Sequence, residues 1–267
     1  MKFATKSPSA GNARASRGLG DKLLAYIGSA KIAEFRILQS LMLTSGNSLR
    51  VTLNRLVRNK KIYNPVRGIY VAKDADPFRV ATTLFPGYLS LSTALYIHHL
   101  SEEYPFTIFV ASEKRGTFTL GEHELRYFKA KNYKGIQESG GGGGGRETEY
   151  RLASVEKALY DSLHHLELVG YGRFMKALNN ADILAKRFLL ITPSGNQGSA
   201  FFQRLGYLLS LLPERDAEKE KLLHACRKRV RANAYLSGRK TKGAYVKEWK
   251  LIDNVGREAL ISSWWQQ

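Results

Sequence analysis

The chain of 267 residues contains a single cysteine, Cys226. One thiol cannot form an intramolecular disulfide or a zinc site built from cysteines, so we expect a reducing compartment, the cytoplasm. No stretch approaches the roughly 18 apolar residues of a membrane span, and no apolar segment follows Lys2 and Lys6 as in a secretory signal. We therefore expect no membrane partner.

The sequence also lacks the motifs of common catalytic sites. His-Glu-x-x-His, Gly-x-Ser-x-Gly, a Walker loop and the dinucleotide fingerprint are all absent. His123 lies between Glu122 and Glu124, a pattern that fits a metal ligand but fits a charged turn better. We assign no catalytic residue, no metal ligand and no cofactor, and we expect a protein that is not an enzyme.

Acidic side chains are scarce, with 23 Asp and Glu against 42 Lys and Arg, which gives a net charge of +19 and a pI of about 10.0. The hydrophobic content of 43% is ordinary for a globular protein and excludes a disordered or fibrous chain. Residues 1–80 carry 15 basic and 4 acidic side chains, residues 81–200 carry 13 and 12, and residues 201–267 carry 14 and 7. The basic excess lies at both ends and favours two surfaces for a polyanionic partner.

The N-terminal third has the element order of a winged helix-turn-helix. Apolar residues at helical spacing predict helices around 23–27, 32–42 and 49–57, and Pro65 and Gly68 predict a reversal between two short strands over 63–70. We expect an α+β fold, with a flexible basic arm at 1–18, a winged helix-turn-helix at 19–74 and a larger mixed α/β domain at 75–267 that ends in helices.

Patterning within the larger domain predicts alternating short strands and helices. The expected strands are 107–111, 117–120, 125–130 and 150–153, and the expected helices are 91–100, 155–168, 173–179, 200–212 and a long charged one at 214–235. Six consecutive glycines begin at Gly140, and they favour a flexible loop at 139–146 over a phosphate cradle because acidic residues follow them.

The third N-terminal helix is the candidate recognition helix for double-stranded DNA. Its apolar stripe at Leu49, Leu53 and Leu56 leaves a cationic stripe facing outward. Arginine bridges guanine O6 and N7, asparagine reads adenine, and further cations neutralise phosphates. The expected DNA-binding residues, including two lysines at the helix exit and one arginine at the hairpin tip, are Arg50, Asn54, Arg55, Arg58, Lys60, Lys61 and Arg67.

A second basic surface is expected near the C-terminus. Acidic residues come first in the segment 214–235 and basic residues follow, so the charges also complement the dipole of the expected helix. A phosphate-contacting face, an acidic protein partner and a solvated helix face all remain open for this surface. Its residues are Arg227, Lys228, Arg229, Arg231, Arg239 and Lys240.

Four stretches together resemble the AbiEi family of abortive-infection antitoxins. They are IYNPVRGIYV at 62–71, YLSLSTALYIHHL at 88–100, SVEKALYDSL at 154–163 and FFQRLGYLLSLL at 201–212. The resemblance implies a transcriptional repressor of a type IV toxin–antitoxin system in phage defence. Its winged helix-turn-helix would bind the promoter of its own operon, and its larger domain would neutralise a cognate nucleotidyltransferase toxin.

The resembling motifs themselves look structural. In SVEKALYDSL we expect a buried face of Val155, Ala158, Leu159 and Leu163, with Glu156, Lys157 and Asp161 paired to neighbours. In the earlier motif we expect Ser90 or Ser92 to cap the helix that begins near residue 91.

Two other function classes remain open. One is a nuclease or nucleotidyl-transfer enzyme of a mobile-element system, and the other is an RNA-binding protein, which the aromatic content of 11% would allow.

Overall fold

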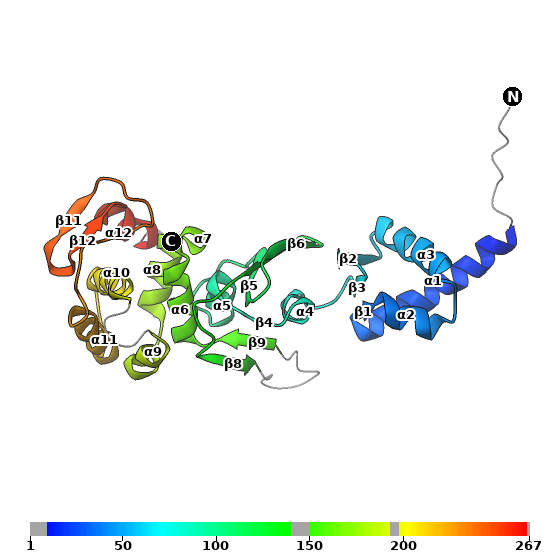
Figure 1. Cartoon of the computed structure of the whole chain (residues 1–267), viewed down its shortest axis with the longest axis horizontal. Coiled ribbons are helices and arrows are strands. Elements are labelled where there is room, and N and C mark those ends of the chain that lie inside the picture. The colour runs from blue at the N-terminus through cyan, green and yellow to red at the C-terminus, as the bar shows by residue number, and fades with distance from the viewer. Residues whose placement is uncertain (1–9, 140–149, 193–197, 266–267) are drawn as a thin grey trace, which may run out of the picture. The chain divides into compact units, whose positions relative to one another are not determined.

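The structure is a computed structural model that describes residues 10–139, 150–192 and 198–265 (Figure 1). Helices and strands are mixed, with a helical region first and sheets after it, so the α+β class is confirmed. The chain divides into an N-terminal unit, up to residue 84 with residues 117–125, and a C-terminal unit, 85–116 with residues from 126 onward. Residues 1–9 of the expected arm and residues 140–146 of the expected glycine loop lie outside the described residues.

The N-terminal unit alternates helices with the strands of a small sheet. Its three strands have the order β1-β3-β2 and pair antiparallel throughout. Its elements are α1 (Ala10–Ala30), β1 (Ile32–Glu34), α2 (Phe35–Met42), α3 (Gly46–Arg58), β2 (Ile62–Val66), β3 (Ile69–Ala72) and α4 (Pro77–Leu84).

One apolar core joins the helices and the sheet of this unit. The periodic residues of α1 and α3 supply half of its buried members, because each helix turns its apolar stripe inward. Buried members of the core are Leu23, Ile27, Ala33, Leu38, Leu49, Leu53, Leu56, Ile62, Tyr70 and Ala72. The spacing used to predict the third helix is therefore confirmed, and its opposite face stays in solvent.

Two details of this unit differ from the sequence prediction. Helix α1 begins at Ala10, inside the segment 1–18 expected as an arm, and the alanines of that segment are strong helix formers. Residues Ile32 to Glu34, expected to start the second helix, form β1 instead. Pairing of β1 with β3, from Ile32 opposite Val71 to Glu34 opposite Ile69, outweighs local helix periodicity.

The turn between α2 and α3 is short. Leu43 ends α2 in the left-handed region with a φ of 45°. Ser45 then caps α3, since its Oγ accepts a hydrogen bond from the Ser48 amide at 3.3 Å. The cap satisfies one of the free amides at the start of α3, which explains why the helix begins there.

A six-stranded mixed sheet has the order β6-β7-β5-β4-β9-β8. Strand β4 pairs antiparallel with β5 and parallel with β9, and β8 pairs antiparallel with β9. The strands are β4 (Gly87–Leu89), β5 (Thr107–Ser112), β6 (Gly116–Leu120), β7 (His123–Phe128), β8 (Ile136–Ser139) and β9 (Tyr150–Ala153).

The helices of the C-terminal unit follow most of the expected ranges. They are α5 (Leu91–Ile97), α6 (Val155–His164), α7 (Leu166–Val169), α8 (Tyr171–Asn180), α9 (Ala185–Ile191), α10 (Ser199–Ser210), α11 (Ala217–Arg227) and α12 (Arg257–Trp265). Within the described ranges, no helix is both long and apolar enough to cross a membrane.

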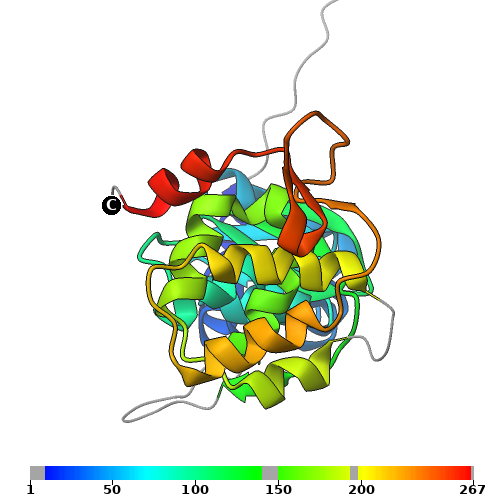
Figure 2. The same ribbon diagram turned by 90° about the vertical axis from the view of Figure 1, so that its left-hand side faces the viewer.

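The long helix expected at 214–235 is wrong in its second half. Helix α11 ends at Arg227, and β10 (Ala234–Tyr235) joins a small sheet of order β10-β12-β11 with β11 (Ala244–Val246) and β12 (Leu251–Asp253). The main-chain oxygen of Arg229 accepts from Ser199 Oγ, and that of Ala232 from Gln203 Nε2. These tertiary bonds hold the segment in a non-helical path (Figure 2).

Candidate nucleic-acid interface

The solvent face of α3 is polar and cationic, with one apolar exception. Asn47, Val51, Asn54 and Arg58 follow at helical spacing on this face, and all four are exposed. Val51 is 69% exposed and packs on nothing in the core. An exposed aliphatic side chain among amides and guanidinium groups suits contact with a base edge, where the thymine methyl is the apolar feature.

The β2–β3 hairpin is held in shape by a single amide. Asn64 Nδ2 donates to the main-chain oxygens of Val66 at 2.8 Å and Ile69 at 2.6 Å. Gly68 turns the chain with a φ of 82°, a value that glycine adopts without strain. The Phe35 amide donates to the Gly68 oxygen at 2.7 Å, so the hairpin turn is bonded to the start of α2.

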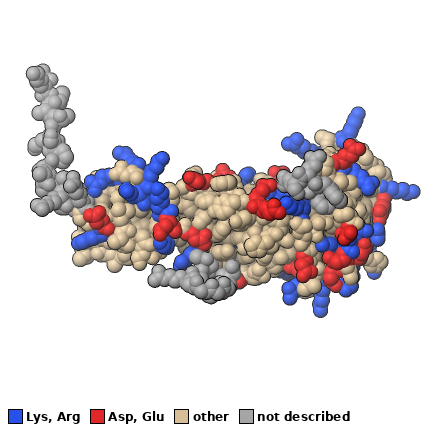
Figure 3. Space-filling model, turned by 180° about the vertical axis from the view of Figure 1, so that it is seen from behind, with Lys and Arg blue, Asp and Glu red and all other residues tan. Residues whose placement is uncertain are grey.

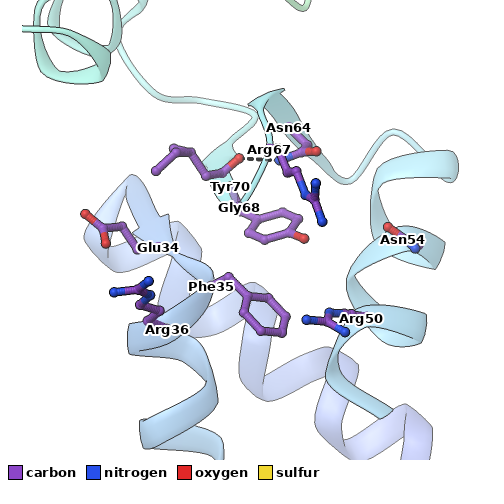
Figure 4. A pocket seen from close by; sticks show the side chains of 10 residues that line it. Glu34, Phe35, Arg36, Arg50, Asn54, Asn64, Arg67, Gly68 and Tyr70 are labelled. Atoms are coloured by element: carbon purple, nitrogen blue, oxygen red, sulfur yellow. Dashed lines mark hydrogen bonds between the residues drawn. The ribbon is translucent and has the colours of Figure 1, made fainter. Parts of the chain in front are cut away.

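A hollow of about 630 Å³ opens between α2, α3 and the hairpin (Figure 4). Figure 4 shows Arg50 and Arg67 pointing into the space beside the Tyr70 ring, with Asn54 on α3 above Arg50 and Arg36 on the other side of Phe35. The hollow is lined by Glu34, Phe35, Arg36, Arg50, Asn54, Asn64, Arg67, Gly68, Ile69 and Tyr70.

The three arginines of this hollow have no acidic partner. Arg36, Arg50 and Arg67 form no ion pair among the described residues, although Glu34 lies at the rim. The Arg50 guanidinium lies over the Phe35 ring, 5.2 Å from its centroid, which fixes its direction. Burial raises the pKa of Tyr70, an effect that the nearby Arg50 charge opposes. The hollow therefore offers oriented guanidinium groups to an anion.

The structure brings together only part of the expected DNA-binding set. Arg50, Asn54 and Arg67 line the hollow. The cations Arg58, Lys60 and Lys61 are exposed at the end of α3 and lie outside it.

Arg55 points elsewhere. An atom in the Cβ position at Gly20 of α1 would lie 3.6 Å from Arg55 Nη2. The guanidinium of Arg55 thus lies beside α1, away from the hollow.

Sequence reasoning missed Arg36, Phe35 and Tyr70 as members of the site. The first two belong to the start of α2 and the third to β3, and periodicity gives no information on contacts between those elements. Val51 was also missed, because an aliphatic residue on a helix is ordinarily assigned to the core.

Basic side chains gather on the N-terminal unit. Figure 3 shows Lys and Arg together there, whereas acidic and basic groups are interspersed on the visible face of the C-terminal unit. An ion pair joins Lys31 to Asp74 in this unit, whereas Arg36, Arg50 and Arg67 form none among the described residues. These three arginines are therefore not neutralised within the described chain.

The expected second basic surface is only partly free. Arg227 Nε bonds Glu248 Oε1 at 2.9 Å, and its guanidinium also lies over the Trp249 ring. Arg229 packs over the Phe202 ring at 4.7 Å and donates to the Ala225 oxygen. These two residues serve the packing of the unit, while Lys228, Arg231, Arg239 and Lys240 are exposed.

A buried polar network lies in the C-terminal unit. Lys157 Nζ donates to Asp161 Oδ1 at 2.8 Å and to the Asn132 oxygen at 2.8 Å. Asp161 Oδ2 accepts from Tyr88 at 2.9 Å and from Ser90 at 2.8 Å. Lys157 and Asp161, each expected to pair with a neighbour, pair with each other, and their side chains are only 0% and 2% exposed. A closed, satisfied network of this kind supports the fold rather than meeting a substrate.

The predicted capping role of Ser90 is half right. Ser90 occupies the position before α5, but its hydroxyl bonds Asp161 and makes no cap bond. Ser92 is buried within α5. Burial of Asp161 raises its pKa, and the hydrogen bond from Ser90 opposes that rise, so the hydroxyl serves the network instead of the helix end.

Comparisons with known proteins do not assign this chain to a family. No family model matches it, and no curated protein matches it. Among the residues that the structure describes, no group of three or more His, Cys, Asp or Glu side chains could hold a metal ion.

Proposed function

We propose that the N-terminal unit is a winged helix-turn-helix that binds double-stranded DNA in a sequence-specific manner. In this proposal α3 enters the major groove and the β2–β3 hairpin is the wing. Arg50, Asn54 and Arg58 meet base edges, while Arg67 and the lysines after α3 hold the phosphate backbone.

The observation that carries the proposal is the set of unpaired arginines at the junction of α3 and the hairpin. Guanidinium groups without carboxylate partners are costly to hold close together unless an anion joins them. The order helix, strand, helix, helix, strand, strand also supports the proposal, because it places a hairpin beside the second helix of a helix-turn-helix.

We further propose that the protein is a transcriptional repressor and antitoxin of the AbiEi type. It would repress its own operon and neutralise a nucleotidyltransferase toxin. The resembling stretches support this role, and so does the closed polar network, since SVEKALYDSL supplies buried structural contacts instead of an open catalytic site.

DNA binding is tested by gel shift on the promoter region of the protein's own gene. Replacing Arg50 by Ala should cost about 1–3 kcal/mol on the operator, a loss of roughly 5-fold to 150-fold in affinity, because a bidentate base contact is removed. Lys61→Ala should weaken operator and unrelated DNA equally.

Lys22→Ala is the matched control, since Lys22 is an exposed cation of α1 in the same unit. Operator binding by the Arg50 variant that equals binding by the Lys22 variant would contradict the recognition-helix assignment.

The antitoxin role is tested by expressing the neighbouring gene with and without this protein. A nucleotidyltransferase encoded there should be toxic when expressed alone and harmless when this protein is co-expressed. Persistent toxicity in the presence of the protein would refute the role.

The absence of catalysis is tested with the purified protein. Metal-dependent cleavage of nucleic acid, or transfer of a labelled nucleotide, should not occur. Either activity would favour an enzyme of nucleic-acid metabolism instead.

A further inference from the structure

Unpaired cations gather a second time, between residues 228 and 250 of the C-terminal unit. The only acid in this segment, Glu248, is bound to Arg227. Seven exposed cations form no ion pair among the described residues and are named here the C-terminal basic surface, namely Lys228, Arg231, Arg239, Lys240, Lys242, Lys247 and Lys250.

Elsewhere the charges are closer to balance, since residues 81–200 carry 13 basic and 12 acidic side chains. Ion pairs join Lys129 to Glu113, Lys176 to Glu102, Arg173 to Glu103, Arg215 to Glu220, Lys219 to Asp216 and Lys221 to Glu218. The segment 228–250, by contrast, carries eight basic side chains and one acidic side chain, so its charge is strongly one-sided.

The loop that carries three of these cations is held in place by an uncharged side chain. Asn254 Nδ2 donates to Ser237 Oγ at 2.8 Å, to Thr241 Oγ1 at 3.2 Å and to the main-chain oxygen of Arg239, and Asn254 Oδ1 accepts from the Ser237 amide at 2.9 Å. Gly243 follows in close contact with the backbone of Asp253, where no side chain would fit.

The bonds that fix the loop use amides, hydroxyls and main-chain atoms. Its cationic side chains therefore remain available to bind a partner. In Figure 2 the segment between β10 and β11 arches away from the helices of the unit.

The composition of this surface identifies the chemistry of its partner. Among the described residues of this segment, Tyr245 is the one large hydrophobic side chain that is exposed, at 54%. A protein interface has an apolar centre, and a membrane-binding face needs apolar side chains to insert. A phosphate backbone needs only cations and hydrogen-bond donors.

We propose that the C-terminal basic surface binds the phosphate backbone of duplex DNA without regard to sequence. This binding does not require α3 to read bases, so it stands apart from the recognition assigned to the N-terminal unit. It would anchor the protein on DNA through a second contact.

The test measures binding of the full-length protein to a duplex of arbitrary sequence by fluorescence anisotropy over a series of salt concentrations. In the triple variant Arg239→Gln, Lys240→Gln and Lys242→Gln, the slope of log affinity against log salt should fall by about 2–3, because each phosphate contact contributes about 0.9.

A matched triple variant, Lys129→Gln, Lys176→Gln and Lys221→Gln, changes the net charge equally but removes cations already paired to carboxylates. Its slope should stay close to that of the parent protein. Equal slopes for the two triple variants would overturn the proposal.

A second set on the same surface guards against a local folding defect. Lys228→Gln, Arg231→Gln and Lys247→Gln together should lower the slope by a similar amount, and circular dichroism should show both sets folded. If neither folded set lowers the slope, the surface is not a DNA contact.

Two further outcomes are informative. Tighter binding of structured RNA than of duplex DNA, lost in the loop variant, would overturn the choice of DNA. If Arg50→Ala does not weaken operator binding, sequence reading by α3 is refuted. The salt-slope measurement on DNA of arbitrary sequence would still test the C-terminal basic surface on its own.

Discussion

Leu43 is the residue at which α2 ends, and its backbone conformation favours glycine. Its φ is 45°, and its side chain is 92% exposed. A left-handed conformation costs a residue with a Cβ atom about 1–2 kcal/mol, and no packing of Leu43 repays that cost. The turn between α2 and α3 is therefore strained at one position.

Replacing Leu43 by Gly should stabilise the N-terminal unit by about 1 kcal/mol, reduced somewhat by the greater freedom of glycine in the unfolded chain. Hydrogen–deuterium exchange of the α3 amides is the appropriate measurement, and exchange should slow several-fold. Leu41→Gly, an exposed change inside α2, should instead speed exchange because glycine is a poor helix former. Faster exchange in the Leu43 variant would show that the turn is not strained.

Some residues of the site can be placed from the spacing within one helix, and others only from contacts between distant segments. Leu49, Leu53 and Leu56 define the buried side of α3, and that definition alone predicts the outward direction of Arg50 and Asn54. Arg36 joins the hollow because the hairpin turn is bonded to the start of α2, a contact between distant segments. Residue spacing within either segment cannot predict that contact.

At the scale of elements, the β2–β3 hairpin depends on Asn64. Asn64→Ala removes both hydrogen bonds of the amide, at 2.8 and 2.6 Å, and should destabilise the hairpin by about 1–2 kcal/mol. Amides of the hairpin should exchange faster, and DNA affinity should fall by about as much as in Arg67→Ala. Asn59→Ala, an exposed change after α3, should alter neither quantity. An unchanged hairpin in the Asn64 variant would show that Gly68 and the bond to α2 suffice.

Elements with a strong local pattern were predicted well. The strand at 107–111 and the helix near 200–212 match β5 and α10 closely, because a β-branched and aromatic run marks the first and an apolar stripe marks the second. Two of the failures, at β1 and at the end of α11, have one cause, namely bonds from another part of the chain. Strand β1 needs β3, and the end of α11 needs Ser199 and Gln203. Local propensity gives no information about these distant bonding partners.

At the scale of the whole molecule, acid should destabilise the protein through His164. Its ring stacks on Phe201 with centroids 4.9 Å apart, and its Nε2 is buried without a hydrogen-bond partner among the described residues. Burial, together with the smaller effect of the nearby Lys131 charge, lowers the pKa of His164 to about 4. A folded-state pKa below the ordinary value of 6.5 stabilises the protein above pH 6.5, and this stability is lost as the pH falls toward 4.

The expected loss between these pH values is on the order of 2 kcal/mol, smaller than the full shift implies because the ring is only partly buried. Urea unfolding followed by tryptophan fluorescence suits the measurement, since all three tryptophans belong to the C-terminal unit. His164→Phe keeps the stacking and should lose less stability over this range, while the exposed His224→Gln should behave as the parent. Equal acid sensitivity in the two variants would assign the effect to other groups.

The distribution of charge is also a property of the whole chain, and the sequence predicted it in outline. The two ends carry the excess, and both the hollow of the N-terminal unit and the C-terminal basic surface hold cations that form no ion pair among the described residues. The sequence could not show that Arg227 and Arg229 lie over aromatic rings, because the rings belong to Trp249 and Phe202 in other segments.

Asn64 and Asn254 give the two cationic loops a common property. Each amide ties its loop through uncharged hydrogen bonds, so neither loop depends on an ion pair for its shape. Dissolved ions screen the exposed cations from a polyanion but leave short amide bonds largely unaffected. If both loops bind DNA as proposed, ionic strength should control how long each stays bound while its shape stays unchanged. Release of one duplex and binding of the next would then need no refolding of either loop.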